Sequence, residues 1–311
     1  MILELLQFLL ILAIAPLVTG VIRKAKARMQ SRRGPSVLQP YRDLRKLLSK
    51  GSVVSNDASW LFNLAPYACL AAVGVAALLV PAVYAGTFGF LGDLIVLIYL
   101  LAMMRFFMAL AALDTGSAFG GMGSSREMYI SSIVEPTMLL SIFAMALVAG
   151  TTSLASIAER IASSGLDLVS PALFLAAAAF FIATLAENAR LPFDNPSTHL
   201  ELTMIHEAML LEYSGKQLAV MEMASMTKLV IFLAILANVF FPWGIATDAA
   251  PLAVAVGLLL FVVKIVLLAL VIALIESSIS KMRLFRLPNL LTVAFILSLL
   301  AVISYYILGV P

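Results

Sequence analysis

One stretch between two long apolar segments gathers many of the groups that could carry protons. The stretch NARLPFDNPSTHLELTMIHEAMLLEYSG, residues 188–215, holds one Asp, three Glu, two His and one Arg. Carboxylates crowded at low dielectric constant raise one another's pKa, so some of them can exchange protons near neutral pH. The candidates for a proton path in or beside this stretch are Glu187, Asp194, His199, Glu201, His206, Glu207 and Glu212.

The prolines in this stretch predict where its helix lies. Pro192 and Pro196 flank Asp194, which makes a continuous helix across this residue unfavourable. The capping residues in DNPST predict a new helix that begins near residue 197 and carries HLELTMIHEAMLLEY. On one face of that helix, Glu201 and Glu212 would lie about 16 Å apart. The segment HEAML lacks the second His of the zinc-protease pattern, so no metal site is predicted.

Three further charged groups fall within apolar segments, where an ionisable group is costly and often functional. Glu135 precedes Pro136, which removes a backbone donor and predicts a local kink. We interpret Glu135 as a proton relay, with a structural hydrogen bond as the alternative. Lys264 is either a relay group or half of a buried ion pair. Arg105 is expected to have a partner on another helix.

The composition places these groups in a polytopic α-helical membrane protein. The 311-residue chain is 63% hydrophobic and only 12% charged, with a mean hydropathy of +1.08. Long apolar runs recur, each near the roughly 20 residues that a helix needs to cross a bilayer. A single cysteine, Cys69, can neither form an internal disulfide nor ligate an iron–sulfur cluster. Any redox chemistry is therefore assigned to a partner protein.

We predict eight spans in one transmembrane domain, residues 1–311, with both termini outside the cell membrane. The spans are expected at about 2–22, 61–84, 92–113, 129–150, 171–188, 228–246, 250–275 and 288–309. Of the 20 basic residues, 17 fall in the loops after the odd-numbered spans, which predicts that these loops are cytoplasmic. The predicted cytoplasmic loops cover about residues 23–60, 114–128, 189–227 and 276–287.

The cytoplasmic loops are also the expected docking surface. The first loop, which includes Arg32 and Arg33, could bind anionic lipid or an acidic partner protein. The second loop, DTGSAFGGMGSSRE, is rich in glycine but lacks the GK[ST] ending of a phosphate-binding loop. We interpret it as a tight connection with Asp114, Arg126 and Glu127 near the cytoplasmic face.

Several motifs in this order resemble one family. They are ARMQSRRGPSVLQPYRDLRKLLSK, LGDLIVLIYLLAMMRFFMALAALDTGSAFGGMGSSRE, VEP, AENARLPFD and EYSG. They look like the membrane-anchor subunit of energy-converting, membrane-bound [NiFe]-hydrogenases of the formate hydrogenlyase type. That subunit is related to the eight-helix subunit of respiratory complex I that shapes the quinone chamber. The resemblance covers nearly the whole chain.

Two departures from the complex I pattern favour the hydrogenase branch. The segment SVLQP directly follows RRGP, where complex I subunits usually insert NRVGPxG. After PFD the chain reads NPSTHLEL instead of LPEAEQEL, so that Ser197 and His199 replace two Glu. These differences weaken the case for a quinone site. They also fit archaeal-type hydrogenases and sulfur reductases.

The resemblance implies a non-redox subunit of a respiratory hydrogenase in the inner (cytoplasmic) membrane. It would anchor the hydrogenase large and small subunits and an iron–sulfur subunit, which hold the [NiFe] centre and the clusters. It would couple their electron transfer to proton or sodium translocation by antiporter-like membrane subunits. Nucleic acid is not an expected partner. The residues carried over from the family motifs are Glu135, Glu187, Asp194, Glu201, Glu212 and Arg126. The alternatives are the equivalent subunit of a quinone- or sulfur-reducing complex, and a passive membrane anchor.

Overall fold

The computed structural model describes residues 2–85, 93–163, 171–195, 204–247 and 250–308, and every regular element in this part is a helix, as predicted. Seven helical segments are long and apolar enough to cross a membrane. They are α1 (Ile2–Met29), α3 (Trp60–Leu79), α4 (Leu94–Asp114), α5 (Ala118–Ala149), α9 (Gly215–Ile235) continued by a π-helix η1 (Leu236–Phe240), α10 (Pro251–Ser278), and the 3₁₀ turn η2 (Leu284–Arg286) continued by α11 (Leu287–Leu308). The predicted fifth span is the shorter apolar helix α7 (Pro171–Glu187).

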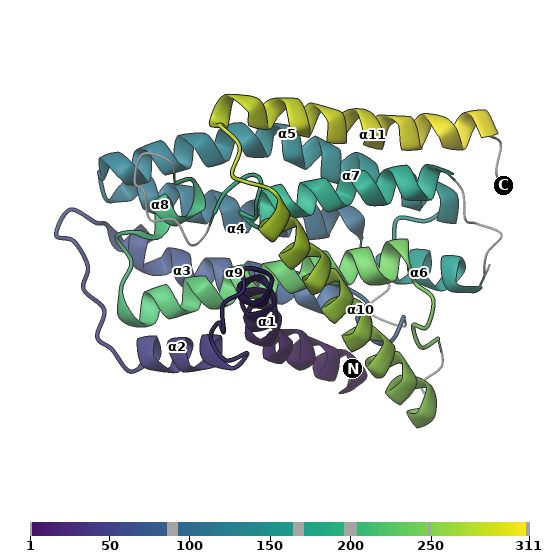
Figure 1. Cartoon of the computed structure of the whole chain (residues 1–311), viewed down its shortest axis with the longest axis horizontal. Helices are drawn as coiled ribbons and strands as arrows, with labels where there is room; N and C mark the ends of the chain where they lie inside the picture. The colour runs from purple at the N-terminus through teal and green to yellow at the C-terminus, as the bar shows by residue number, and fades with distance from the viewer. Residues whose placement is uncertain (1, 86–92, 164–170, 196–203, 248–249, 309–311) are drawn as a thin grey trace.

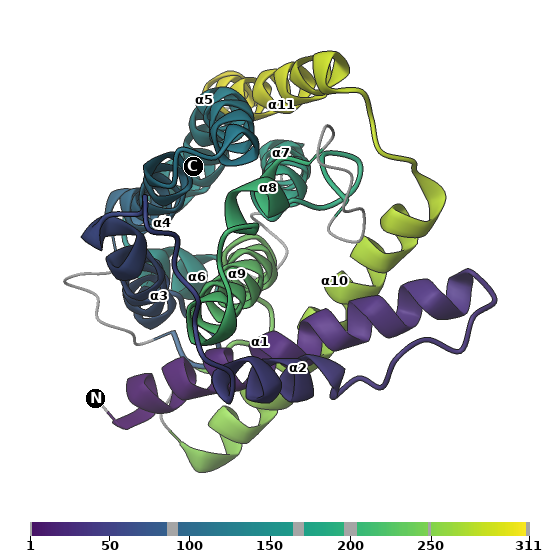
Figure 2. The same cartoon turned by 90° about the vertical axis from the view of Figure 1, so that its left-hand side faces the viewer.

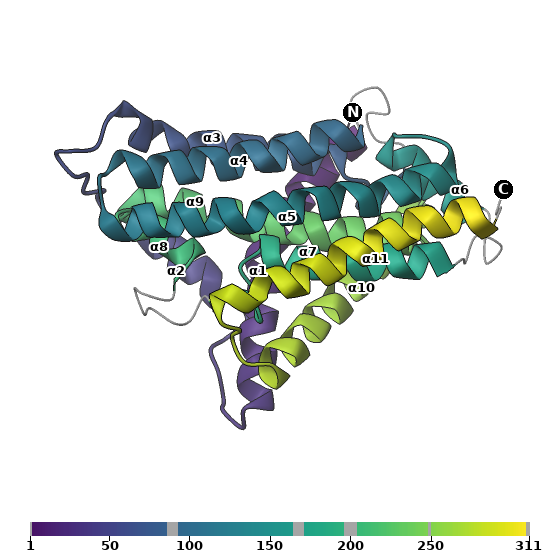
Figure 3. The ribbon, with the colours of Figure 1, turned by 90° about the horizontal axis from the view of Figure 1, so that it is seen from above.

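Helix α9 lies at the centre of the bundle (Figures 1 and 2). Its most apolar stretch is 89% buried, against 28% for α10 and 22% for α11. Helix α3 packs between α4 and α9, and α11 lies along the outside of α5 and α7 (Figure 3). Helix α1 crosses the bundle beside α9 and pairs with α10 (Figure 2). These two outer helices therefore border the central helix on one side only.

Polar residues at the helix ends explain several boundaries. The Ser59 hydroxyl accepts a hydrogen bond from the Leu61 N–H at 3.2 Å and caps α3. Asp93 does the same for α4 through the Ile95 N–H at 3.4 Å. Gly150, at φ 64°, ends α5 in a left-handed conformation that suits glycine. Asp93 therefore caps its own helix and has no cationic partner among the described residues.

The glycine-rich segment before Glu127 is helical, so the prediction of a tight connection is wrong. Helix α5 begins at Ala118, and the glycines allow its first turns to pack closely. A Cβ atom on Gly120 would lie 2.5 Å from the Ala112 carbonyl oxygen, and one on Gly123 would lie 2.8 Å from the Ala208 Cβ atom. The glycines thus provide contact with α4 and α8 rather than a turn. Helix α5 also continues through Pro136 as one helix, so the predicted kink does not end it.

The polar stretch holds a much shorter helix than expected. Among the described residues between α7 and α9, only α8 (His206–Leu210) forms a helix, and the chain turns at Leu211 and Glu212. Helix α9 then begins at Gly215 instead of near residue 228. Two further helices, α2 (Gln39–Leu48) and α6 (Leu154–Ser163), lie in segments for which no helix was predicted. Both are short and amphipathic, and the search for long apolar runs passes over such helices.

Candidate functional site

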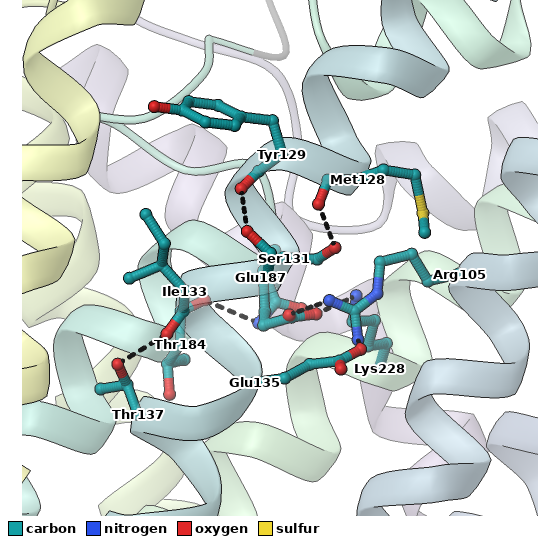
Figure 4. Close-up of polar contacts among 12 residues, drawn as sticks. Arg105, Met128, Tyr129, Ser131, Ile133, Glu135, Thr137, Thr184, Glu187 and Lys228 are labelled. Atoms are coloured by element: carbon teal, nitrogen blue, oxygen red, sulfur yellow. Dashed lines mark hydrogen bonds and ion pairs between the residues drawn. The ribbon is translucent and has the colours of Figure 1, made fainter.

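A network of ion pairs crosses the centre of the bundle and is built around Arg105. Arg105 lies near the middle of α4, and its side chain is only 2% exposed. Its Nη1 atom donates a hydrogen bond to Glu187 Oε1, at the end of α7, at 2.7 Å. Its Nη2 atom lies 2.5 Å from Glu135 Oε1 on α5 (Figure 4). One guanidinium therefore joins two carboxylates from two other helices.

Glu187 has a second cationic partner. The ammonium of Lys228, on the central helix α9, lies 2.8 Å from Glu187 Oε2, and both side chains are 2% exposed. Each oxygen of the Glu187 carboxylate thus faces a different cation (Figure 4). Such a buried charge is tolerated only because it is paired. The result is an ionic contact between α4, α7 and α9 in the interior.

Glu127 adds a third carboxylate to this network. It lies two turns before Glu135 on α5, is buried, and interacts electrostatically with Lys228, Glu187 and Arg105. With every group ionised, three carboxylates face two cations, which leaves one negative charge in excess. A single proton would neutralise the network. We use the name central network for Arg105, Glu127, Glu135, Glu187 and Lys228.

A second ionic contact surrounds Asp194, which is 3% exposed. Its Oδ1 atom accepts a hydrogen bond from the Lys281 ammonium at 2.6 Å, from the segment after α10. Its Oδ2 atom accepts the backbone N–H groups of Ile205 and His206 at 3.1 and 3.2 Å. Asp194 therefore fixes the start of α8 as well as the connection between α10 and α11.

A third contact joins the two outer helices to the bundle. Glu276, near the end of α10, is 5% exposed and lies 3.3 Å from both Lys26 on α1 and Arg190 after α7. Two cavities adjoin this contact, of about 600 and 110 Å³, and Arg23 and Arg190 line both. The larger cavity is bordered mainly by α1 and the residues that follow it.

His206 and Glu207 line the smaller cavity. The His206 ring is buried, and its Nε2 atom lies 3.4 Å from the Ser225 hydroxyl oxygen. Burial lowers the pKa of His206 below its ordinary value of 6.5, although the neighbouring Glu207 acts in the opposite direction. The ring is therefore neutral at pH 7. Its Nδ1 atom has no hydrogen-bond partner among the described residues.

Comparison with known proteins assigns the chain to a family. A family model described as NADH dehydrogenase matches residues 3–306, which is nearly the whole chain. The chain belongs to this NADH dehydrogenase family. The resemblance seen in the sequence motifs is thereby confirmed.

The similar proteins are subunits of membrane complexes. Formate hydrogenlyase subunit 4 of Escherichia coli is 39% identical over 96% of this chain and 97% of its own length. Hydrogenase-4 component C of the same organism is 34% identical over 95% and 92%. An NADH-quinone oxidoreductase subunit of Rubrobacter xylanophilus is 29% identical over 74% and 71%. A chain of the archaeal membrane-bound sulfane sulfur reductase has the same fold, with a TM-score of 0.84, 21% identity, and coverage of 96% and 97%.

The structure brings together some of the residues predicted for a proton path in this NADH dehydrogenase family member. Glu135 and Glu187 meet at Arg105, whereas Asp194 and His206 meet at the start of α8. Glu212 is exposed on the turn after α8 and has no ion pair among the described residues. His199 and Glu201 lie outside the described residues. The predicted shared face of Glu201 and Glu212 required a longer helix than the structure has.

Lys264 forms no ion pair among the described residues, so that alternative for it is wrong. Its ammonium donates to the Ala237 and Phe241 carbonyl oxygens at 3.0 and 2.7 Å, and lies 3.2 Å from Asn238 Oδ1. It therefore binds the carbonyl end of η1, which continues α9, where the helix dipole favours a cation. Asn238 in turn donates to the Pro81 and Ala82 carbonyl oxygens. A role for Lys264 as a relay stays a prediction.

The predicted docking residues lie in different settings. The Arg126 guanidinium donates to the Met204 carbonyl oxygen at 2.8 Å and fixes the segment before α8. The Asp114 carboxylate accepts the Ser59 N–H at 2.8 Å. Arg33 is exposed, and Arg32 is exposed and lines the larger cavity. Of these four residues, the last two therefore suit a docking surface best.

Sequence reasoning missed several members of the three ionic contacts, among them Lys228, Glu127 and Glu276. Lys228 was counted with a cytoplasmic loop, Glu127 was placed near the cytoplasmic face, and Glu276 received no role. The signal for Lys228 was present in the sequence, because MTKLVIFLAILANVFF places this lysine at the start of a long apolar run. A basic residue in such a run needs a carboxylate partner.

Proposed function

We propose that this chain is the non-redox membrane subunit of a hydrogenase complex of the formate hydrogenlyase type. It anchors a soluble module that holds the [NiFe] centre and the iron–sulfur clusters. It couples electron transfer in that module to the translocation of protons, or of sodium ions, by antiporter-like membrane subunits. In support, two relatives that are 39% and 34% identical over nearly the whole chain are both named as parts of hydrogen-linked complexes.

The redox groups belong to partner subunits in this proposal, because the described residues do not suit a metal cluster. Cys69 is fully buried, and its thiol donates to the Met104 carbonyl oxygen. No group of three or more His, Cys, Asp and Glu in the described part of the chain could hold a metal ion. The [NiFe] centre would supply hydrogen chemistry at the docked module. This chain would respond through its charges.

The observation that carries the coupling role is the set of paired charges in the central network, which has one negative charge in excess when every group is ionised. Two unit charges about 3 Å apart interact by roughly 5 kcal/mol at an effective dielectric constant of about 20. Doubling that separation weakens the attraction by nearly 3 kcal/mol, which changes a carboxylate's proton affinity about a hundredfold. A small shift of α7 or α9 would therefore move a proton onto or off the network. This is the property that a coupling element requires.

The composition of the complex tests the proposal first. We would purify the complex through a tag on this chain in mild detergent, then measure nickel, iron and hydrogen evolution in the product. Nickel and hydrogen evolution that co-elute with the chain are expected. Iron without nickel, together with quinone or sulfur reduction, would instead assign the chain to a quinone- or sulfur-reducing complex. The relatives that are named as parts of NADH-quinone oxidoreductases keep the quinone alternative open.

Neutral replacement of Glu135 tests the coupling role. Glu135→Gln removes one carboxylate but keeps its shape, and Glu135 is the least buried member of the central network, at 40% exposure. We expect hydrogen evolution and subunit composition to persist while ion translocation in proteoliposomes falls at least about tenfold. Glu212→Gln, at an exposed residue, is the control. Unchanged translocation in Glu135→Gln would favour a passive anchor.

A further inference from the structure

The outward face of α5 differs in composition from the outward faces of α10 and of the second half of α11. Its exposed residues follow helical spacing and form one stripe along the helix. They are Ser125, Met128, Tyr129, Ser132, Pro136, Leu139 and Phe143. The carboxylate of Glu135 borders this stripe with a side chain that is 40% exposed. We use the name α5 stripe for these seven residues with Glu135.

Glu135 lies deep within the membrane-spanning part. It contacts Arg105, which stands near the middle of the 21-residue helix α4. Within α5, 17 residues precede Glu135 and 14 follow it. A carboxylate at this depth meets hydrocarbon, protein or enclosed water on its open side. Charged groups that face hydrocarbon are costly, and membrane proteins almost always turn them toward protein or water.

The other outer helices show what a lipid-facing surface of this chain looks like. Between Leu252 and Leu274 on α10, every exposed side chain is aliphatic. The exposed side chains in the second half of α11, such as Leu299 and Ile303, are predominantly aliphatic as well. The α5 stripe interrupts this pattern with two serines, a tyrosine and a carboxylate. It therefore does not match a surface that faces lipid tails.

The same turn of α5 also presents a second acceptor. Pro136 has no N–H, so it cannot donate the usual helical hydrogen bond to the carbonyl of Ser132. The Ser132 hydroxyl donates back along its own helix, to the Tyr129 carbonyl oxygen at 2.8 Å. The Ser132 carbonyl and the Glu135 carboxylate thus lie within one turn of α5. Both groups can accept a hydrogen bond from a donor on a neighbouring helix.

We propose that, in the assembled complex, the α5 stripe is covered by a membrane-spanning helix of another subunit that places a hydrogen-bond donor or a positive charge opposite Glu135. This rests on the proposed function, since it requires a complex with further membrane subunits. The partner side chain would offset the excess negative charge of the central network. It would also link that network directly to the neighbouring subunit.

Site-specific photo-crosslinking in the intact complex tests the inference. A benzophenone amino acid is placed at Ser132 in the α5 stripe, or at Leu267 on α10 as the matched control for a lipid-facing position. The tagged complex is irradiated in native membranes, purified, and mapped by mass spectrometry. We expect the probe at Ser132 to join a membrane subunit that co-purifies in equal amount. The mapped site should lie within one helical turn of a side chain that donates a hydrogen bond or carries a positive charge, namely Lys, Arg, His, Asn, Gln, Ser, Thr, Tyr or Trp.

The probe at Leu267 should give lipid adducts only. Lipid adducts alone at Ser132, in a complex that retains all its subunits, would overturn the inference, and so would a mapped partner turn without any donor. A second readout is the rate at which the cross-linked subunit is lost in detergent. This rate should rise at least about tenfold for Glu135→Leu, because a hydrogen bond to a charged group is removed, and less for Glu135→Gln. None of these readouts needs nickel or hydrogen evolution, so a failed hydrogenase assignment would be distinguished from a failed interface.

Discussion

Glu187 holds the central network together because, within that network, it is the carboxylate with a cation on each oxygen. Arg105 keeps Glu135 as a second partner if Glu187 is lost, but Lys228 has no other ion pair within the described part of the chain. Removing one side of a buried pair leaves an uncompensated charge, which costs far more than the pair itself contributes. The residue most sensitive to substitution is therefore Glu187 and not the more exposed Glu135.

Glu187→Gln should destabilise the protein by about 3–5 kcal/mol, since Lys228 would stay buried beside a neutral amide. The measurement is the thermal unfolding of the purified chain in detergent, read as the loss of helical circular dichroism. Glu212→Gln, on the exposed turn, should unfold like the parent protein. A Glu187→Gln variant with an unchanged unfolding temperature would contradict the ion pairs described for α7 and α9.

His206 should make stability depend on pH. Because burial lowers its pKa in the folded state below 6.5, the unfolded state binds more protons as the pH falls. Stability is fully present above about pH 6.5 and declines below it, toward the folded-state pKa. Thermal unfolding at a series of pH values would show this decline, and His206→Gln should flatten it. If the unfolding temperature fell equally with pH in the parent protein and in His206→Gln, a group other than His206 would be responsible for the decline.

Among the elements, the start of α9 depends on a loop that is distant in sequence. The Ser214 hydroxyl accepts the Val53 N–H at 2.8 Å and donates to the Val53 carbonyl oxygen at 3.0 Å. Gly215 has φ 54°, and a Cβ atom there would lie 2.3 Å from the Gly51 carbonyl oxygen. The YSG motif therefore fixes the connection between α2 and α3 against the first turn of the central helix.

Gly215→Ala should detach this connection. The substitution combines a strained φ with a clash against backbone, and we expect a cost above about 1 kcal/mol. Limited trypsin digestion should then cleave after Lys50 at a higher rate than in the parent protein. Gly121→Ala, where an added Cβ meets nothing within 4 Å, is the matched control and should leave the rate unchanged. Equal cleavage of both variants would show that the contact does not hold the loop.

Element type was predictable wherever one apolar run made one helix. The spans expected at 92–113 and 171–188 agree closely with α4 and α7, because polar caps and prolines mark their ends. The start of α5 was missed because glycine signals a turn in sequence but provides close packing here. The start of α9 was missed because Lys216, Gln217 and Glu222 make its first turns look like a loop. Those first turns face polar cavities and loops instead of lipid.

In the whole molecule, basic residues are concentrated at the end that carries α2 and α8 (Figure 1). Helix α6, with Arg160, lies at the opposite end, together with the C-terminus. The positive-inside rule predicts that the first end is cytoplasmic. Alkaline phosphatase fused after Ser163 should therefore be active, whereas the same enzyme fused after Lys50 should be inactive. Fusions of green fluorescent protein at the same sites should give the reverse pattern, and agreement between the two reporters at either site would contradict this orientation.

Two acids of the candidate site were predictable from the sequence, but the pairing of its charges was not. Glu135 and Glu187 were identified because a carboxylate in an apolar segment stands out in any sequence. Their meeting at Arg105 could not be derived, because the contact joins residues up to 82 positions apart on separate helices. Lys228 was assigned to topology because its helix was expected to begin only there. The position of a charge along its helix decides whether it orients the chain or pairs inside it.

The π-helix at the end of α9 has a consequence for insertions and deletions. A π-turn holds one residue more than an α-helical turn, and Leu236–Phe240 is such a segment. Deleting one residue there would restore regular helix but rotate all that follows by about 100°. Asn238 would lose Pro81 and Ala82, and Lys264 would lose the carbonyl groups that it binds. This short segment therefore tolerates no change in the number of its residues. The lipid-facing helices around it, in contrast, could exchange one aliphatic side chain for another at little cost.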